Sequence, residues 1–423
     1  MNIYRLLLIF GSLFVSLVSN GAAETLDQAW ATAMAVDQRL AAVSAQVHAA
    51  DCNTVAAQRM RVPAIKHATG YNVLTDAPTI GFGGMGIPLV DDDFVLSTTM
   101  AEVPIYTGGQ ISSSIQAASA QASATKHSYQ KGVLDVKLDV ATSYTAVLRA
   151  QKAVDTATAN EQSLAAHEEV VRALLERGRV PQNDLYAAQV ARADATQKAL
   201  QARNALAIAQ AGYNRLLGRL LDSPVVVDEL VVPPPSGDLE MLTSQAMVTR
   251  PELAALACQA TALRHQADST RAATRPHVGV EGGYVYLESP SIDPNSYGAL
   301  MLGLEWKPFD GGVSKAKSNA MLHSATSISR TRDNLQTLIA LQVQNTWLTE
   351  QETRKRIEVT SQAISQAEEN LRAAKVRFEN GAAINTEVLD AETLRTQAFN
   401  NYHNAVYDAV LATFRLQRAV GTL

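Results

Sequence analysis

The chain has 423 residues, a formal net charge of −5 at pH 7 and an aromatic content of only 5%. That length allows two or three ordinary domains or one elongated one, and the scarcity of aromatic side chains disfavours a large globular core. The sequence contains no basic block, so nucleic acid is excluded as an expected partner.

The N-terminus has the pattern of a secretory signal peptide. Arg5 precedes the apolar run LLLIFGSLFVSLV (6–18), and small residues follow it, so we expect residues 1–23 to be removed by cleavage after Ala23. Cysteine is absent near this site, which excludes a lipid anchor there. The remaining chain has no apolar run long enough for a membrane-spanning helix. If it spans a membrane, it must do so with strands closed into a barrel.

The rest of the chain is a tandem duplication. Several glycines recur 203 residues later, namely Gly108, Gly109 and Gly178 as Gly311, Gly312 and Gly381. Upstream, Gly70 and Tyr71 recur 213 residues later, so the first copy must carry ten additional residues between Tyr71 and Gly108. We therefore predict a first repeat at 24–222, a Pro-rich linker at 223–238 and a second repeat at 239–423.

Each repeat is predicted to have the same order of elements. A helix comes first (about 25–61 and 239–274), followed by two short strands, a Gly-Gly break, a very long helix, a glycine turn and another long helix. A continuous helix from Gly109 to Arg177 would be about 100 Å long at 1.5 Å per residue. Globular helices rarely reach that length, which indicates coiled coils or bundle helices.

Apolar and small residues recur at seven-residue steps along these helices and predict a packing seam. The seam comprises Ala150, Ala157, Leu164 and Val171 in the first repeat and Ile357, Ile364, Leu371 and Phe378 in the second. A coiled-coil rod fits this periodicity equally well.

The predicted strands distinguish a membrane protein from a rod. In GALMLGLEWKPF (298–309) and HVGVEGGYVYL (277–287), apolar residues alternate with polar or very small ones, as in membrane barrel strands. The first repeat is less regular, because His67 and Thr99 interrupt its apolar face. Four strands cannot close a barrel, which needs about eight, so a membrane-embedded chain would have to share a barrel with further copies. Three copies would supply twelve strands.

These features resemble the TolC-like outer-membrane efflux and secretion channel family. The resemblance is carried by the doubled plan, VPIYTGGQ (103–110), WKPFDGGV (306–313), the two glycine-turn motifs and the terminal GTL. It implies a mainly α subunit with a membrane β-barrel part, and a homotrimer with a 12-stranded barrel in the outer membrane of a Gram-negative bacterium and an α-helical periplasmic tunnel. It also implies a passive exit duct of a tripartite efflux pump or type I secretion system. The implied partners are a periplasmic adaptor, an inner-membrane transporter and outer-membrane lipid.

The glycine-turn motifs, LERGRVPQNDLYAAQ (175–189) and RFENGAAINTEVLDAE (377–392), are the candidate functional site. Gly178 and Gly381 are predicted to reverse the chain, because glycine accepts the backbone angles of a helix stop at little cost. Carboxylate and amide side chains follow at the start of the returning helices, where they favour the positive helix N-terminus. They are Asn183, Asp184 and Glu387.

Glu387 and Asp390 are three residues apart and share a helix face. The resemblance implies that they face a channel entrance, where threefold repetition would bring about six carboxylates together and favour cations. In similar channels an aromatic hydroxyl and an arginine tie neighbouring helices to an aspartate at this point. Phe378 and Ala383 occupy those positions here and cannot make such bonds. Asp184 thus lacks its expected partners, and we expect a closed state held by fewer polar links.

No enzyme, cofactor or metal site is predicted. GFGGMG (81–86) matches a dinucleotide-binding pattern, but such a site needs a helix after its last glycine, and Pro88 follows instead; we expect an external loop. The run Asp91–Asp93 could bind a divalent cation, although a solvated run is the favoured interpretation, and HEEVV (167–171) lacks the second His of a zinc protease helix. Pairing of Cys52 with Cys258 is left open. The alternative function is a structural or adhesive periplasmic coiled-coil protein without transport.

Overall fold

The structure is a computed structural model that describes residues 23–83, 85–288 and 293–423. Its internal contacts divide the chain into two compact units. The first unit comprises residues up to 35, 140–232 and 356–411, and the second comprises residues 36–139, 233–355 and 412–423. The predicted signal peptide, except for Ala23, lies outside the described residues. Within the described residues, no helix combines the length and the apolar content needed to cross a membrane.

The predicted duplication is visible in the helices and strands themselves. In the second repeat, α5 (Leu239–Thr249), α6 (Pro251–Ala272) and β5 (His277–Leu287) begin 213 residues after α1 (Leu26–Val36), α2 (Gln38–Arg59) and β1 (Ala64–Val73). Likewise, β6 (Ser296–Glu305), α7 (Val313–Glu379) and α8 (Asn385–Val420) begin 203 residues after β4 (Asp93–Tyr106), α3 (Gln110–Glu176) and α4 (Gln182–Leu216). The two repeats therefore share one plan, and each compact unit combines segments of both.

The prediction of a single first helix in each repeat was wrong, because both helices are interrupted after eleven residues. Asp37 has an extended backbone, and its side chain accepts hydrogen bonds from the backbone N–H groups of Arg39 and Leu40, so a new helix begins there. At the related position in the second repeat, Pro251 disfavours the helical conformation of the residue before it, and Arg250 is extended.

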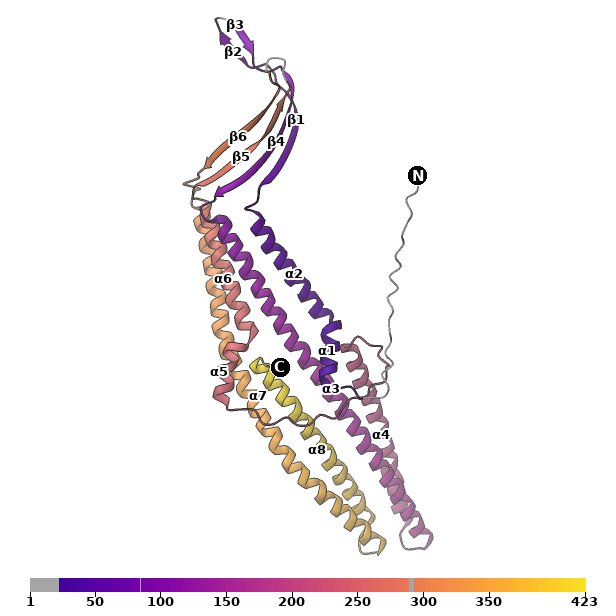
Figure 1. Cartoon of the computed structure of the whole chain (residues 1–423). Coiled ribbons are helices and arrows are strands. Elements are labelled where there is room, and N and C mark those ends of the chain that lie inside the picture. The colour runs from indigo at the N-terminus through magenta and orange to yellow at the C-terminus, as the bar shows by residue number, and fades with distance from the viewer. Residues whose placement is uncertain (1–22, 84, 289–292) are drawn as a thin grey trace, which may run out of the picture. The chain divides into compact units, whose positions relative to one another are not determined.

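The four main strands form one antiparallel sheet in the order β1-β4-β5-β6 (Figure 1). The ten additional residues of the first repeat fall between β1 and β4, as predicted. They form a separate two-stranded hairpin of β2 (Thr79–Phe82) and β3 (Met85–Pro88) instead of the expected loop. GFGGMG lies in this hairpin, with Gly84 outside the described residues, and a strand rather than a helix follows its last described glycine.

The strand register confirms that the apolar residues of β5 and β6 share one face. Val280 lies opposite Leu302, and Val278 lies opposite Leu304. The leucines of β6 remain 68–83% exposed in the single chain. Directly opposed residues of an antiparallel pair point to the same side, so these strands present a continuous apolar face that the single chain does not bury.

The two polar residues that interrupt this face in the first repeat are cross-strand partners. His67 on β1 lies opposite Thr99 on β4, and His67 Nδ1 is 2.9 Å from Thr99 Oγ1. Next to them, the hydroxyls of Thr69 and Ser97 are 2.9 Å apart. These groups satisfy one another, which lowers the cost of placing them on an apolar surface.

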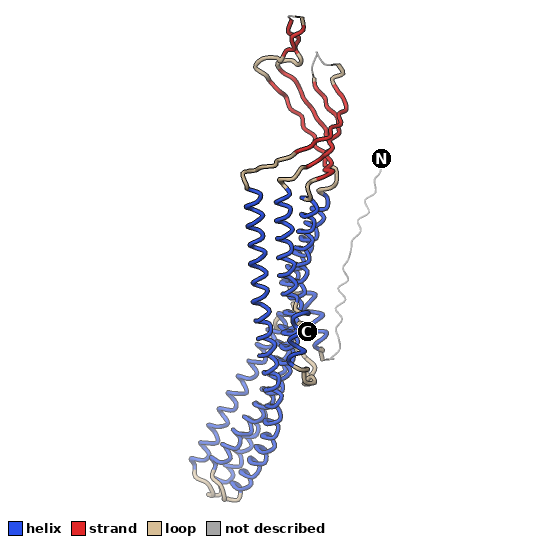
Figure 2. The backbone as a smooth tube through the Cα atoms, turned by 90° about the vertical axis from the view of Figure 1, so that its left-hand side faces the viewer, coloured by secondary structure: helices blue, strands red, loops and turns tan. Residues whose placement is uncertain are grey.

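Glycines mark each break between a strand and a long helix. Gly108, Gly109, Gly311 and Gly312 all have positive φ angles, between 60° and 93°. After these breaks, α3 and α7 each continue for 67 residues, which confirms the predicted length, and both belong to the helical portion coloured blue in Figure 2. The predicted seam is buried in its half nearest the turns, at Leu164, Val171, Leu371 and Phe378, and half-buried at its other four positions.

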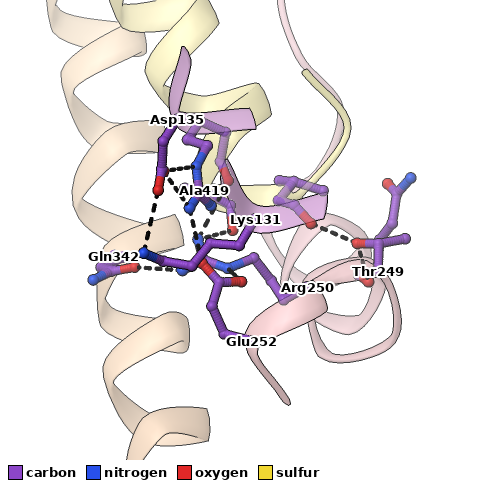
Figure 3. A network of polar contacts seen from close by, with 10 residues as sticks. Lys131, Asp135, Thr249, Arg250, Glu252, Gln342 and Ala419 are labelled. Carbon is purple, nitrogen blue, oxygen red and sulfur yellow. Dashed lines mark hydrogen bonds and ion pairs between the residues drawn. The ribbon is translucent and has the colours of Figure 1, made fainter. Parts of the chain in front are cut away.

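The second unit contains a buried polar network where the end of α8 meets the break between α5 and α6 (Figure 3). Arg250 donates to the backbone oxygen of Ala419 at 3.0 Å and pairs with Glu252 at 3.0 Å. Arg418 pairs with Glu252 at 2.8 Å and with Asp135 of α3 at 2.6 Å. A small apolar core surrounds this junction and includes Leu253, Ile339, Val343 and Leu416.

Candidate functional site

The predicted chain reversals occur at Gly178 and Gly381, both in the first unit. Their φ angles are 67° and 75°, in the left-handed region that glycine occupies without steric cost. The N–H of Arg179 donates to Leu174 O at 2.9 Å, and that of Ala382 donates to Arg377 O at 2.7 Å. This six-to-one hydrogen bond satisfies a carbonyl at the helix end, so both turns stop their helices in the same way.

Asn183 and Asp184 lie in the first turn of α4, Glu387 lies in the first turn of α8, and Asp390 lies in the second turn of α8. Asn183 and Asp390 are exposed, and Asp184 and Glu387 are half-buried. Glu387 pairs with Arg377 at 3.2 Å, across the turn. Asp184 makes its described hydrogen bonds through its backbone: its N–H donates to Pro181 O at 3.1 Å.

Phe378 and Ala383 pack into an apolar core formed by the ends of both helical hairpins. Phe378 is only 4% exposed and belongs to a cluster that includes Val171, Leu174 and Val388, and Ala383 packs against it. Phe378 therefore helps to hold the α3–α4 hairpin to the α7–α8 hairpin within one chain.

A hydrogen-bonded chain that the sequence did not indicate runs beside this core. His167 Nε2 donates to Asn385 Oδ1 at 2.7 Å, and Asn385 Nδ2 donates to the backbone oxygen of Asp184 at 3.1 Å. The His167 ring lies 5.3 Å from the Phe378 ring, and both His167 and Asn385 are almost completely buried. Burial is the main cause that lowers the pKa of His167, so the imidazole is neutral at neutral pH.

Two buried carboxylates near the turns each have two cations within 4 Å. Glu168 binds Arg172 and Arg192, with the Arg192 contact at 3.0 Å. Glu392 binds Lys375 at 2.7 Å and lies 3.9 Å from Arg395.

The cations of these two clusters are related by the duplication. Lys375 and Arg395 lie 203 residues after Arg172 and Arg192. The carboxylates are not related in this way, because Glu168 lies on a long helix and Glu392 on a returning helix. The recurrence of these cations at the 203-residue repeat spacing is the sequence signal that could have revealed the clusters.

Taken together, the turns form a compact, internally bonded end to two helical hairpins, with an outer set of carboxylates that are not buried. Such an end can present negative charge to a solvent-filled passage. Within the described residues, no group of three or more His, Cys, Asp or Glu residues is placed to bind a metal ion.

This fold and site define a class of protein: a duplicated subunit of long helical hairpins that carries a four-stranded sheet with an unburied apolar face. A model of the outer membrane efflux protein family matches residues 31–219 and 242–422. The chain belongs to this family and is an outer-membrane efflux channel. The family is one of channels rather than enzymes. Membership of it does not favour the alternative function, a structural or adhesive periplasmic coiled-coil protein without transport.

Solved structures of outer-membrane channels share the fold. VceC from Vibrio cholerae matches with a TM-score of 0.79 and 17% identity, covering 94% of this chain and 96% of VceC. CmeC from Campylobacter jejuni matches with a TM-score of 0.78 and 12% identity, covering 94% and 85%. MtrE from Neisseria gonorrhoeae matches with a TM-score of 0.76 and 15% identity, covering 94% and 88%. No curated protein sequence gives a significant match.

Proposed function

We propose that three copies of this chain, each built from the repeats 24–222 and 239–423 and the linker 223–238, form one channel. The support comes from the sheet, in which β1 and β6 are edge strands and an apolar face is left unburied. Open sheet edges are not tolerated in lipid, and three sheets of four strands would close a barrel of twelve. The same threefold assembly would surround a passage with the long helices.

We propose that the channel is a passive exit duct that opens when a periplasmic adaptor and an inner-membrane transporter engage it. One related channel, MtrE, has been crystallised in an open state, which supports a duct whose aperture changes. Cargo would then diffuse outward through the passage without chemistry by this chain.

We propose that Glu387 and Asp390 face the passage at the periplasmic entrance and select cations. The observation that carries this proposal is their location: they lie on the first turn or the next of α8, directly after the Gly381 turn, and neither is fully buried. Arg377 offsets part of the Glu387 charge at 3.2 Å, whereas no ion pair is described for Asp390. Asp390 would therefore contribute more to selectivity than Glu387.

The test is the reversal potential of single channels in planar bilayers under a salt gradient. We expect a cation-selective wild type, a clear shift towards anions in D390N and a smaller shift in E387Q. The matched control is E369Q, which removes an exposed carboxylate of α7 that is paired with Arg372. Selectivity that is unchanged in a D390N/E387Q double variant would exclude the proposed ring.

We also propose that the closed entrance is held by fewer polar links than in relatives with a tyrosine and an arginine at this point. Phe378 and Ala383 support this, since both are apolar and packed inside the chain. The same bilayer recordings measure the resting conductance. We expect it to be higher than in tightly gated relatives, and an equally low value would contradict this part of the proposal.

A further inference from the structure

A cleft in the first unit, between α3 and α8, has a chemical character that the channel proposal does not use. It is lined by Asp155, Thr156 and Ala159 of α3 and by Arg395, Thr396, Phe399 and His403 of α8, and its volume is about 190 Å³. The residues proposed for the channel entrance are not among those that line it.

The wall on α8 is aromatic. The rings of Phe399 and His403 are stacked, with centroids 6.3 Å apart and planes 30° apart. The ring centroids of Tyr402 and His403 are 5.6 Å apart, and the side chains of Phe399, Tyr402 and His403 are half-buried. Two rings, Phe399 and His403, therefore line the cleft, and Tyr402 lies beside them.

Arg395 lies above this wall with its guanidinium carbon 5.3 Å from the Phe399 centroid. A guanidinium stacked on a ring directs its N–H groups outward in its own plane, where they can bind a carboxylate through two parallel hydrogen bonds. The nearby carboxylate of Glu392 does not occupy them: Lys375 binds Glu392 at 2.7 Å, and Arg395 lies 3.9 Å away, beyond hydrogen-bonding distance.

The duplication supplies an internal comparison. Arg192 is the counterpart of Arg395, and it is held by Glu168 at 3.0 Å. The counterparts of Phe399 and His403 in the first repeat are Thr196 and Leu200. The first repeat packs its returning helix without either ring, so helix packing alone does not require the aromatic wall.

We propose that this cleft binds a small aromatic carboxylate, with its ring against Phe399 and His403 and its carboxylate on Arg395. The volume is below the roughly 300 Å³ at which drug-sized pockets begin, which suits a ligand of one or two rings. Asp155, whose carboxylate accepts from Gln151 at 3.2 Å, disfavours a second negative charge on the ligand and favours a donor at its far end. Burial lowers the pKa of His403, so its ring stacks as a neutral aromatic group at neutral pH.

The test is a fluorescence titration of the detergent-solubilised full-length mature chain with 2-naphthoate. We expect saturable binding that weakens about tenfold when 2-naphthamide or cyclohexanecarboxylate replaces it, since one lacks the charge and the other the aromatic ring. R395Q and F399L should each weaken naphthoate binding about tenfold, and R395K should weaken it less than R395Q does.

The matched control is R192Q, which removes the repeat-related arginine and should leave naphthoate affinity within about twofold. Circular dichroism of each variant establishes that it is folded, and R395K and F399L test the cleft even if R395Q does not fold. Equal affinities for naphthoate and naphthamide, or equal effects of R395Q and R192Q, would overturn the proposal. A cleft covered by a neighbouring subunit would give no saturable binding and would overturn it as well, while leaving the channel function intact.

Discussion

At the scale of single residues, the duplication provides pairs of related glycines that share a backbone conformation but have different neighbouring side chains. Gly108 and Gly311 have φ angles of 60° and 70° at the same point of each repeat. A Cβ atom on Gly108 would lie 2.5 Å from Arg275 Cβ, whereas one on Gly311 would meet nothing within 4 Å. Both positions therefore need a residue that accepts a positive φ angle, but only Gly108 also needs a residue without a Cβ atom.

We expect G108A to destabilise the protein more than G311A. Both substitutions should cost about 1–2 kcal/mol for a left-handed residue with a Cβ atom. G108A should cost about 1–3 kcal/mol more, because Arg275 must move and its 2.7 Å hydrogen bond to Gly108 O is disturbed. Thermal unfolding of the detergent-solubilised variants measures the difference, and equal losses would show that the contact with Arg275 adjusts freely.

His167 makes the stability of the turns dependent on pH. Its pKa is lowered from the usual 6.5, mainly by burial and further by Lys375, while Asn385, Glu392 and Glu379 act in the opposite direction. The unfolded chain therefore takes up a proton at a higher pH than the folded chain does. The stability that the neutral imidazole provides is complete above pH 6.5 and is lost as the pH falls from there towards the folded pKa.

We expect the free energy of unfolding to fall as the pH is lowered from about 6.5 to about 5.5, by at most about 1.4 kcal/mol per pH unit from this group, and the unfolding temperature to fall with it. H167Q keeps a donor for Asn385 but cannot be protonated, so it should reduce this dependence. H48Q, at an exposed site on α2, is the control and should behave like the wild type. An unchanged pH dependence in H167Q would show that His167 is not a source of it.

At the scale of helices and strands, buried ion pairs fix the points where elements meet. Glu252 lies between Arg250 and Arg418 and joins the start of α6 to the end of α8 (Figure 3). The side chains of all three are at most 12% exposed. Removing the carboxylate would leave Arg250 without its ion-pair partner and next to the like charge of Arg418, which would keep only Asp135. An uncompensated charge away from water is more costly than the loss of a surface pair.

We therefore expect E252Q to destabilise the protein by about 3–5 kcal/mol. The comparison is E369Q, which breaks an ion pair whose partners are both more than 60% exposed and should therefore cost much less. Unfolding temperatures of the two variants measure the contrast. A cost of E252Q no larger than that of E369Q would mean that water reaches the network when the carboxylate is lost.

At the scale of the whole molecule, the sheet separates two kinds of surface. One face carries Leu300, Leu302 and Leu304, and the opposite face carries Lys66, Glu102 and Glu281, with Lys66 and Glu102 paired at 3.3 Å. Lipid on the first face and water on the second would satisfy both, which is the arrangement of a barrel wall with a polar interior.

Matched substitutions on adjacent residues of β6 test this arrangement. L302K places a charge on the apolar face and should cost about 2–4 kcal/mol in the membrane, which would reduce the trimer recovered from outer membranes after a high-salt wash. M301K places the same charge on the opposite face and should leave recovery close to that of the wild type. Equal recovery of the two variants would contradict the assignment of the faces.

Local features let the order and spacing of the elements be predicted from the sequence. The positive-φ glycines, the seven-residue seam and the alternation in β5 and β6 depend on residues close in the chain, and the structure confirmed all three. The break before Pro251 is local too and could have been predicted from the proline. The acidic residues after the Gly381 turn were found from the same motif, and their role in selectivity stays a prediction.

By itself, the sequence determined the duplication, the lengths of the long helices and the positions of the turns, because backbone angles and periodicity are set by neighbouring residues. Only the tertiary structure decided that His67 pairs with Thr99 and that Phe378 packs in a core beside His167. It also decided that Arg192 is hydrogen-bonded to Glu168, whereas Arg395 lies 3.9 Å from Glu392. These contacts join distant segments, 218 residues apart for His167 and Asn385. They depend on which helix faces lie together, and no pattern along one segment specifies that.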